Sequence, residues 1–351
     1  MKLRSLLSRA LGCACIWLSA CALAAPTAQP TSDTLNGVID EVGAYPSPLV
    51  AQRADPWVLR HDGFYYFIAT VPEYDRIELR RSATIAGLPQ ADAEVVWRKH
   101  ASGPMSAHIW APELHRIDGA WYIYFAAGEA ENPWNIRMYV LRNGADNPLQ
   151  GEWQELGRIA TPVDSFSLDA TTFTHKGKRY LAWAQYDVED DLGSLLLMAE
   201  MKSPTEIRLP VITLSQPDLA WETRGHKVNE GPAVLKRNGR IFISYSASAT
   251  DANYAMGLLW ADADADLMDP QSWHKAQQPV FHTNAETKRF GPGHNSFTVA
   301  EDGETDLLIY HARDYREIKG NPLSDGNRAT RVRPLYWDEN GMPDFRQHAG
   351  D

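Results

Sequence analysis

The sequence predicts an all-β protein, a five-bladed β-propeller, on three observations. Helical periodicity is scarce after the first thirty residues, short β-rich runs alternate with Gly, Pro, Asn and Asp, and one hairpin pattern recurs five times. A hairpin repeated at a nearly constant spacing is typical of four-stranded sheets arranged around an axis. A β-sandwich with coincidentally similar hairpins is the alternative that this spacing leaves open.

Each repeat consists of a strand, a turn in which Asp, Lys or Asn precedes Gly, and a second strand rich in aromatic residues. Such dipeptides favour two-residue turns because both central residues of the turn need φ > 0. The turn glycines are residues 63, 119, 177, 239 and 303, so successive turns are 56 to 64 residues apart. The five repeats are Asp55–Phe67, Ala111–Tyr124, Asp169–Trp183, Gly231–Tyr245 and Asn295–Tyr310.

Alignment of the repeats on these glycines reveals a ring of polar residues at the start of the first strands. Eight residues before the glycine are Asp55, Ala111, Asp169, Gly231 and Asn295, and nine before it are Ala54, Trp110, Leu168, Glu230 and His294. The start of each innermost strand of a propeller faces the central channel, so three carboxyl groups should converge there. Without basic neighbours they would repel one another and separate their pKa values, which suits either a cation or glycoside hydrolysis.

The overall composition narrows the class of protein. With 351 residues, 44% hydrophobic and 23% charged, the chain is globular rather than disordered. A net charge of -11 argues against nucleic acid as a partner, because phosphate binding needs a basic face. Many of the 12 Trp, 14 Tyr and 10 Phe fall in the second strands of the hairpins, where we expect them to pack the blades together.

Residues 1–24 have the features of a secretory signal peptide, with basic residues followed by a short apolar run. Two endings compete: Leu18–Cys21 resembles a lipobox that would place a lipid on Cys21, and Ala22–Ala24 is an A-x-A cleavage site. All three cysteines (Cys13, Cys15 and Cys21) lie in this segment, so the mature domain should have no disulfide and no thiolate site.

The expected organisation is therefore a signal peptide at 1–24, a linker at 25–44, a propeller catalytic domain at 45–346 and a tail at 347–351. We expect a monomer exported from a bacterial cell, as a periplasmic protein, a membrane-anchored lipoprotein or a secreted protein.

Five motifs, one per repeat and in order, resemble the signature set of glycoside hydrolase family 43. They are Ala54–Trp57, Trp110–Glu113, Ser167–Ala170, Asn229–Pro232 and Gly291–Phe297. The resemblance covers about residues 45 to 346, including the closing Trp337–Pro343. It implies an inverting glycosidase on a five-bladed propeller.

The same resemblance implies roles for individual residues. Asp55 corresponds to the general base, Glu230 to the general acid, and Asp169 to the residue that tunes the pKa of the acid and positions substrate. His294 resembles an axial histidine that stands beside a metal ion or a water cluster. Any structural calcium or sodium ion in the channel should be mostly bound by water, because one imidazole suits these ions poorly.

Four further residues could contact substrate or brace the site. Trp110 could stack on a sugar face, although a strand Trp is more often part of a core. His108 could donate to a substrate hydroxyl, and Arg328 matches an arginine that the family places near substrate. Glu113 more often braces a loop, and Asp262–Asp266 reads as a solvated loop because it lacks the Gly and distal Glu of a helix-loop-helix calcium site.

The sequence says less about the sugar. The motifs look most like the α-L-arabinofuranosidase branch, including exo-acting enzymes on α-1,5-arabinan, with arabinan, arabinoxylan or their oligosaccharides as substrates. A β-xylosidase or an endo-α-1,5-arabinanase of the same family, and a non-catalytic sugar-binding propeller, are the alternatives. Exo or endo action depends on loops at the ends of the cleft, for which segments 71–81, 128–137 and 187–194 are candidates.

Overall fold

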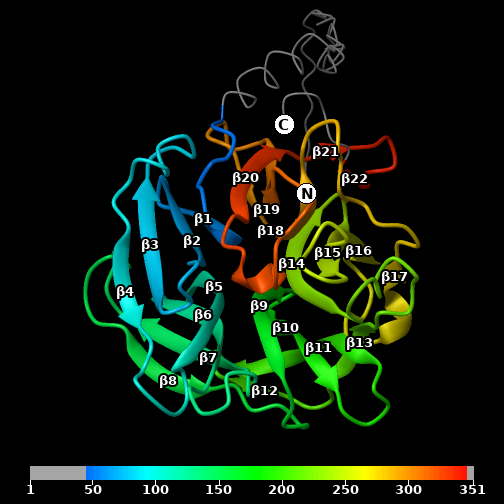
Figure 1. Cartoon of the computed structure of the whole chain (residues 1–351). Coiled ribbons are helices and arrows are strands. Elements are labelled where there is room, and N and C mark those ends of the chain that lie inside the picture. The colour runs from blue at the N-terminus through cyan, green and yellow to red at the C-terminus, as the bar shows by residue number, and fades with distance from the viewer. Residues whose placement is uncertain (1–44, 346–351) are drawn as a thin grey trace, which may run out of the picture. The chain divides into compact units, whose positions relative to one another are not determined.

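Five antiparallel sheets surround a common centre in the computed structural model, which describes residues 45–345 (Figure 1). The all-β, five-bladed propeller is thereby confirmed, and the β-sandwich is excluded. The predicted signal peptide, linker and tail lie outside the described residues.

The first three blades each follow the order of the chain from the innermost strand outwards. Blade 1 contains β1 (Ala54–His61), β2 (Phe64–Thr70), β3 (Arg76–Ser82) and β4 (Glu94–Arg98). Blade 2 contains β5 (Ala107–Ile117), β6 (Ala120–Gly128), β7 (Arg137–Asn143) and β8 (Gln154–Arg158). Blade 3 contains β9 (Ser167–His175), β10 (Lys178–Asp187), β11 (Gly193–Ser203), β12 (Glu206–Ile207) and β13 (Ile212–Ser215).

The last two blades follow the same order and are succeeded by a small hairpin. Blade 4 contains β14 (Asn229–Arg237), β15 (Arg240–Ala247), β16 (Ala255–Asp262) and β17 (His274–Lys275). Blade 5 contains β18 (Phe290–Val299), β19 (Asp306–Arg313) and β20 (Ala329–Pro334), and β21 (Tyr336–Trp337) pairs with β22 (Pro343–Asp344).

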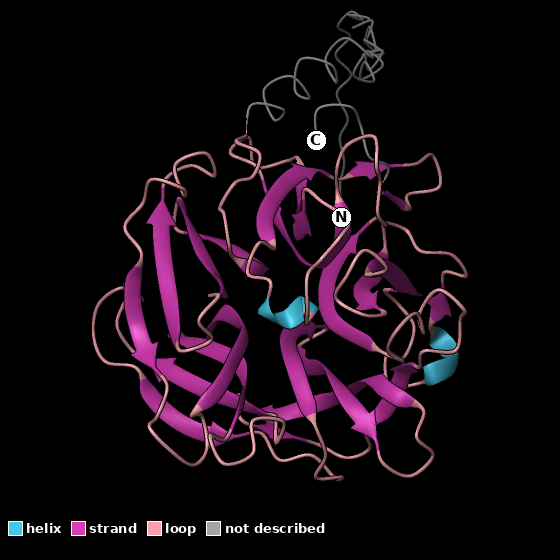
Figure 2. Ribbon diagram, in the orientation of Figure 1, coloured by secondary structure: helices cyan, strands magenta, loops and turns pink. Residues whose placement is uncertain are grey.

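Helix is confined, among residues 45–345, to two short 3₁₀ segments, η1 (Pro270–Ser272) and η2 (Pro322–Ser324) (Figure 2). No helix in this part of the chain is long and apolar enough to cross a membrane.

The ring of blades is closed by the start of the described chain. Val50 forms an antiparallel bridge with Thr330 of β20, and the Leu49 amide donates to the Thr330 carbonyl at 2.8 Å. The N-terminal segment therefore contributes to the outer edge of blade 5 before the chain enters blade 1. This pairing ties the two ends of the propeller together and covers a sheet edge.

The tight turns expected in the hairpins form in four of the five repeats. His61 pairs with Phe64, Ile117 with Ala120, His175 with Lys178 and Arg237 with Arg240, and both residues of each turn have φ > 0. The fifth turn is longer than predicted: Val299 is the last residue of β18 to pair, with Asp306, and the Ala300 amide donates to the Thr305 carbonyl. In that turn only Gly303 has a positive φ.

Each innermost strand also carries a β-bulge near its start, and at one equivalent position in every strand the φ lies between 43° and 58°. The bulge residues are Asp55, Ala111, Asp169, Gly231 and His294. His294 is thus equivalent to Asp55 and not to Glu230, so the alignment on Gly303 is wrong by one residue in blade 5. The reason is that the turn of hairpin β18–β19 is longer than the others, which places Gly303 nine residues after the bulge instead of eight.

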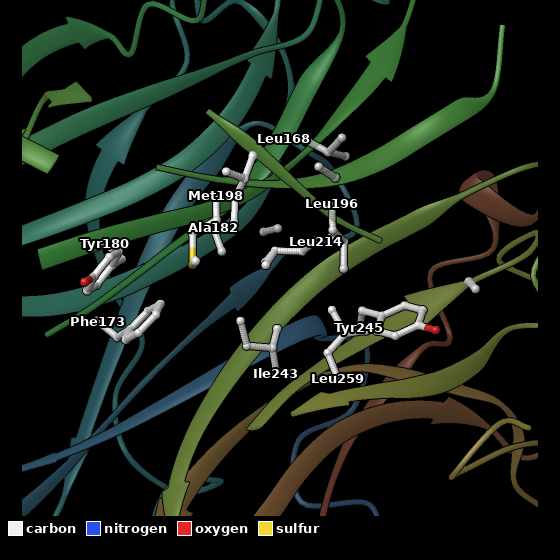
Figure 3. Packing of buried hydrophobic residues seen from close by; sticks show 14 of the residues in the cluster. Leu168, Phe173, Tyr180, Ala182, Leu196, Met198, Leu214, Ile243, Tyr245 and Leu259 are labelled. Carbon is white, nitrogen blue, oxygen red and sulfur yellow. The ribbon is translucent and has the colours of Figure 1, made fainter. Parts of the chain in front are cut away.

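The aromatic residues pack between neighbouring blades, as expected from their place in the second strands. Five separate clusters of buried apolar residues join adjacent blades: four of them link two blades each, and the fifth links blades 2, 3 and 4. Phe173 and Tyr180 of blade 3 belong to the same cluster as Ile243 and Leu259 of blade 4 (Figure 3). The Trp excess is therefore largely architectural; Trp121 and Trp183 are fully buried on β6 and β10.

The substitution Gly119→Ala tests the left-handed turn between β5 and β6. Gly119 has φ +77°, and nothing lies within 4 Å of the position of an added Cβ, so the cost comes from the backbone alone. We expect the free energy of unfolding to fall by about 1–2 kcal/mol, measured by denaturant titration. Gly144→Ala is the matched control because Gly144 lacks a positive φ and has only distant side-chain atoms nearby; equal losses in both variants would contradict the expectation.

Candidate active site

A cavity of about 390 Å³ opens where the innermost strands begin. Its lining includes all three carboxyl residues singled out from the sequence, Asp55, Asp169 and Glu230, together with Trp110, His294 and Arg328. The residues come from β1, β9, β14, β5, β18 and the segment before β20, so every blade contributes. Only His108 of the predicted site residues lies outside this lining.

Asp55 is held by charged and polar partners on two blades. Its Oδ1 lies 3.2 Å from an Arg328 guanidinium nitrogen and 3.3 Å from His311 Nδ1, and its Oδ2 accepts from the Thr70 hydroxyl at 2.6 Å. The expectation of carboxyl groups without basic neighbours is therefore wrong. Arg328 is far from Asp55 along the chain, and only closure of the ring brings the two together.

The charge of Arg328 keeps Asp55 ionised. Burial alone would raise the pKa of this carboxyl group, but the Arg328 guanidinium holds the pKa well below its usual range. The Asp55 amide donates to His311 Nδ1 at 3.0 Å, so that nitrogen must be unprotonated. Burial lowers the pKa of His311 to about 3, consistent with a neutral imidazole.

Glu230 lies in the opposite electrostatic environment. Burial raises its pKa to about 7, and the negative charge of Asp55 adds to the rise, while a hydrogen bond from the Tyr254 hydroxyl at 2.7 Å opposes it. Asp55 and Glu230 thus titrate far apart. The cavity offers one ionised carboxylate and one carboxyl group that keeps its proton up to about neutral pH.

Asp169 resembles Glu230 in the direction of its pKa shift. Burial, and then the charges of Glu230 and Asp55, raise its pKa well above the usual range. Its Oδ2 accepts from the amide of Gly231 at 2.9 Å. Because Gly231 directly follows Glu230, Asp169 fixes the backbone that carries the Glu230 side chain.

His294 joins the carboxyl groups from the fifth blade. Its Nδ1 lies 3.4 Å from Asp55 Oδ1 and 4.0 Å from Asp169 Oδ2. Burial lowers its pKa despite the favourable charge of Asp55, so the ring is neutral. Its face lies against Gly231, where an added Cβ would approach the ring within 3.1 Å.

An aromatic wall lines one side of the cavity. Trp110 stacks on His108 with ring centroids 4.4 Å apart, and Tyr74 and Trp134 meet Trp110 edge-on. His108 Nδ1 contacts the Pro133 carbonyl at 2.9 Å, and the ring lines an adjoining pocket instead of the cavity that holds the carboxyl groups. Trp134 is 54% exposed and presents the accessible face of this wall.

Two other acidic motifs lie outside the cavity. Glu113 is buried in β5, where its Oε2 contacts His115 Nε2 at 2.8 Å, so it braces a strand and not the loop that we expected. Asp262, Asp264 and Asp266 are exposed, as predicted for a solvated segment.

The loops that shape the cavity are only partly those predicted. Trp134 of segment 128–137 and Ser194 of segment 187–194 line it, whereas segment 71–81 reaches the adjoining pocket through Tyr74. Sequence reasoning missed the loop between β19 and β20, which contributes Asn321–Leu323, and it missed Tyr254 and His311. No motif in the sequence marks these residues. Trp134 could have been predicted to line the cavity, because it is an aromatic residue in one of the candidate loops.

The arrangement does not form a metal centre of its own. Within residues 45–345 no group of three or more His, Cys, Asp or Glu side chains is placed to hold an ion. Arg328 also brings a positive charge to Asp55. A calcium or sodium ion in the channel stays a prediction, and it would depend on water ligands.

Comparison with known proteins identifies relatives across most of the chain. The family model of glycosyl hydrolases family 43 matches residues 45–343. An extracellular exo-α-(1→5)-L-arabinofuranosidase of Streptomyces avermitilis is 57% identical over 302 residues, which is 86% of this chain and 63% of that protein. The chain thus spans less than two thirds of the length of that relative.

Two further relatives are covered over more of their own length. An enzyme of the same name from Streptomyces chartreusis is 58% identical over 279 residues, covering 79% of this chain and 85% of the relative. The crystal structure of an α-L-arabinofuranosidase from Lactobacillus brevis superposes with a TM-score of 0.84 at 51% identity, covering 87% of this chain and 97% of the other.

The substitution Glu230→Gln tests the cost of the buried carboxyl group. A carboxyl group whose pKa is raised on folding destabilises the folded protein at high pH. The loss of stability develops as the pH rises from the unfolded-state pKa of about 4.5 through the folded-state pKa of about 7. We therefore expect Glu230→Gln to be more stable than the natural protein at pH 8, by up to about 3 kcal/mol. At pH 4, where both forms are uncharged at this position, the difference should vanish.

Denaturant titration at the two pH values measures this difference. Glu339→Gln, at an exposed position, controls for the change of charge alone. A stabilisation that is the same at pH 4 and pH 8 would contradict the assignment.

Proposed function

Because the chain belongs to glycosyl hydrolase family 43, we propose that it is an exo-acting α-L-arabinofuranosidase that releases L-arabinofuranose with inversion. The observation that carries the proposal is the pairing, in one cavity, of an ionised Asp55 with a Glu230 that retains its proton up to about pH 7. Inverting hydrolysis requires one carboxylate to act as a base and one carboxylic acid to act as a proton donor.

Asp55 is the base in this proposal. It removes a proton from the water molecule that attacks the anomeric carbon. The Arg328 guanidinium and the Thr70 hydroxyl hold both oxygens of Asp55 in place, 3.2 and 2.6 Å away. The Arg328 charge keeps the group ionised, as a water-activating base must be before each turnover.

Glu230 is the acid. It donates its proton to the glycosidic oxygen as the bond from that oxygen to the anomeric carbon breaks, so charge does not accumulate on the leaving group. Asp169 supports this step through the Gly231 amide and through its charge coupling to Glu230. No step in the scheme uses a metal ion.

The exo mode is supported by the loop between β19 and β20. Asn321–Leu323 of this loop line the cavity, and η2 lies near the middle of the ring of strands in Figure 2. The Tyr74 hydroxyl donates to the Leu323 carbonyl at 2.6 Å and fastens the loop of blade 5 to blade 1. A wall fixed on two blades limits how many sugars extend past the carboxyl groups in that direction.

The substrates proposed are arabinan, arabinoxylan and their oligosaccharides. The exposed indole of Trp134, beside Trp110, offers an apolar surface for the sugar unit that leaves. We also propose that the protein acts outside the cytoplasm, in keeping with the extracellular relatives and with the features of residues 1–24.

The variants Asp55→Ala and Glu230→Ala test the two roles. Each should lower kcat/KM on arabino-oligosaccharides by about 10²–10⁴-fold or more while the far-ultraviolet circular dichroism spectrum stays that of the natural protein. Asp262→Ala, an exposed carboxyl group outside the cavity, is the control and should keep full activity. Full activity in either cavity variant would refute the assignment.

The stereochemistry and the substrate are tested separately. Proton NMR of the first sugar formed should show the anomer opposite to that of the substrate, and net retention would exclude the inverting mechanism. Aryl α-L-arabinofuranoside should be cleaved in preference to aryl β-D-xyloside, and linear arabinan should yield single arabinose units. Preferred cleavage of the xyloside, internal cleavage of arabinan, or binding without cleavage would favour the respective alternatives.

A further inference from the structure

A buried tyrosine touches the carboxyl group that we propose as the acid. The Tyr254 hydroxyl donates to Glu230 Oε1 at 2.7 Å, and the tyrosine is 1% exposed. Burial raises the pKa of this phenol well above its usual value, with the charge of Glu230 adding to the rise. Tyr254 therefore keeps its proton, and can donate it in a hydrogen bond, at and around neutral pH.

Both the backbone and the ring of Tyr254 are held in place by neighbouring residues. Its amide donates to the Asp251 carbonyl at 3.2 Å, which closes the turn between β15 and β16. An added Cβ at Gly293 would lie 2.4 Å from the ring, so the ring fills the space that this glycine leaves open. The ring also stacks parallel to the ring of His311, with the two ring centroids 5.7 Å apart.

His311 connects this tyrosine to the second carboxyl group of the site. Its Nδ1 accepts from the Asp55 amide and lies 3.3 Å from Asp55 Oδ1. The two stacked rings thus link the two carboxyl groups: Tyr254 contacts Glu230, and His311 contacts Asp55. A displacement of Tyr254 would affect the position of Glu230 first.

We propose that Tyr254 is a positioning residue that holds Glu230 Oε1 and so leaves the acidic proton on Oε2, the oxygen available to the glycosidic bond. An oxygen that accepts from a phenol is the poorer site for the proton of a carboxylic acid, and Oε2 has no hydrogen-bond partner among the described residues. The inference rests on the proposed function, because it requires Glu230 to be the acid.

The variant Tyr254→Phe keeps the ring and removes the hydroxyl. On arabino-oligosaccharides we expect kcat to fall about tenfold, the effect of losing one hydrogen bond to an ionisable group, with KM little changed. Because the lost bond favours the ionised carboxylate, the pKa of Glu230 should rise, and the alkaline limb of the pH profile should move to higher pH. An aryl arabinofuranoside with a good leaving group needs little proton donation, so its hydrolysis should fall much less.

Tyr245→Phe is the matched control. Tyr245 is also a buried tyrosine of blade 4, and its hydroxyl donates to a buried carboxyl group, that of Glu222, at the same distance of 2.7 Å. It should lower the unfolding temperature as much as Tyr254→Phe does, yet leave the alkaline limb unchanged. An equal shift in the control, or an unmoved limb in Tyr254→Phe, would overturn the proposal.

A second measurement separates this inference from the function on which it rests. In a Glu230→Ala background, Tyr254→Phe should cause no further loss on the activated aryl substrate, since the tyrosine acts through the glutamate. A further tenfold loss would indicate a structural role and refute the inference. Failure of the proposed function itself would appear elsewhere, as full activity of Glu230→Ala or as no hydrolysis of any arabinofuranoside by the natural protein.

Discussion

The site depends on a backbone bulge that recurs at the start of the innermost strand of every blade. Its left-handed residue is Asp, His or Gly in four blades, types that tolerate φ > 0 better than most. The bulge amide is held by a side chain of the preceding blade in four cases, such as the donation from Ala111 to the Thr70 hydroxyl and from His294 to the Ser246 hydroxyl. Each blade thus sets the position of the next, and the bulge turns functional side chains towards the cavity.

The electrostatics of the cavity follow from this geometry. Two of the bulge residues are aspartates, but the ring gives them unlike neighbours: the Arg328 guanidinium contacts Asp55, whereas Asp169 is buried beside another carboxyl group. Burial is common to both groups, so the difference comes from the charges around them. One blade repeated five times therefore produces one carboxyl group with a lowered pKa and two with raised pKa values.

Much of the fold could be predicted because its cause is local. A Gly turn between two aromatic-rich strands is encoded in about a dozen adjacent residues, and four of the five turns form as expected. The fifth differs because the turn of hairpin β18–β19 is longer and places its glycine one residue further from the bulge, which the glycine alone does not reveal. The loop that carries Leu323 was missed for a similar reason: it has no repeated pattern, and its place over the cavity depends on a bond from Tyr74 in another blade.

The sequence by itself determined the number of blades, the three carboxyl residues and the family, since all of these are carried by short motifs in fixed order. The tertiary structure decided the chemical state of those carboxyl groups. Arg328, His311 and Tyr254 come from parts of the chain far from the residues they contact, and only the closed ring places them within hydrogen-bonding distance. A pKa depends on charges and burial in space, which no local stretch of sequence contains.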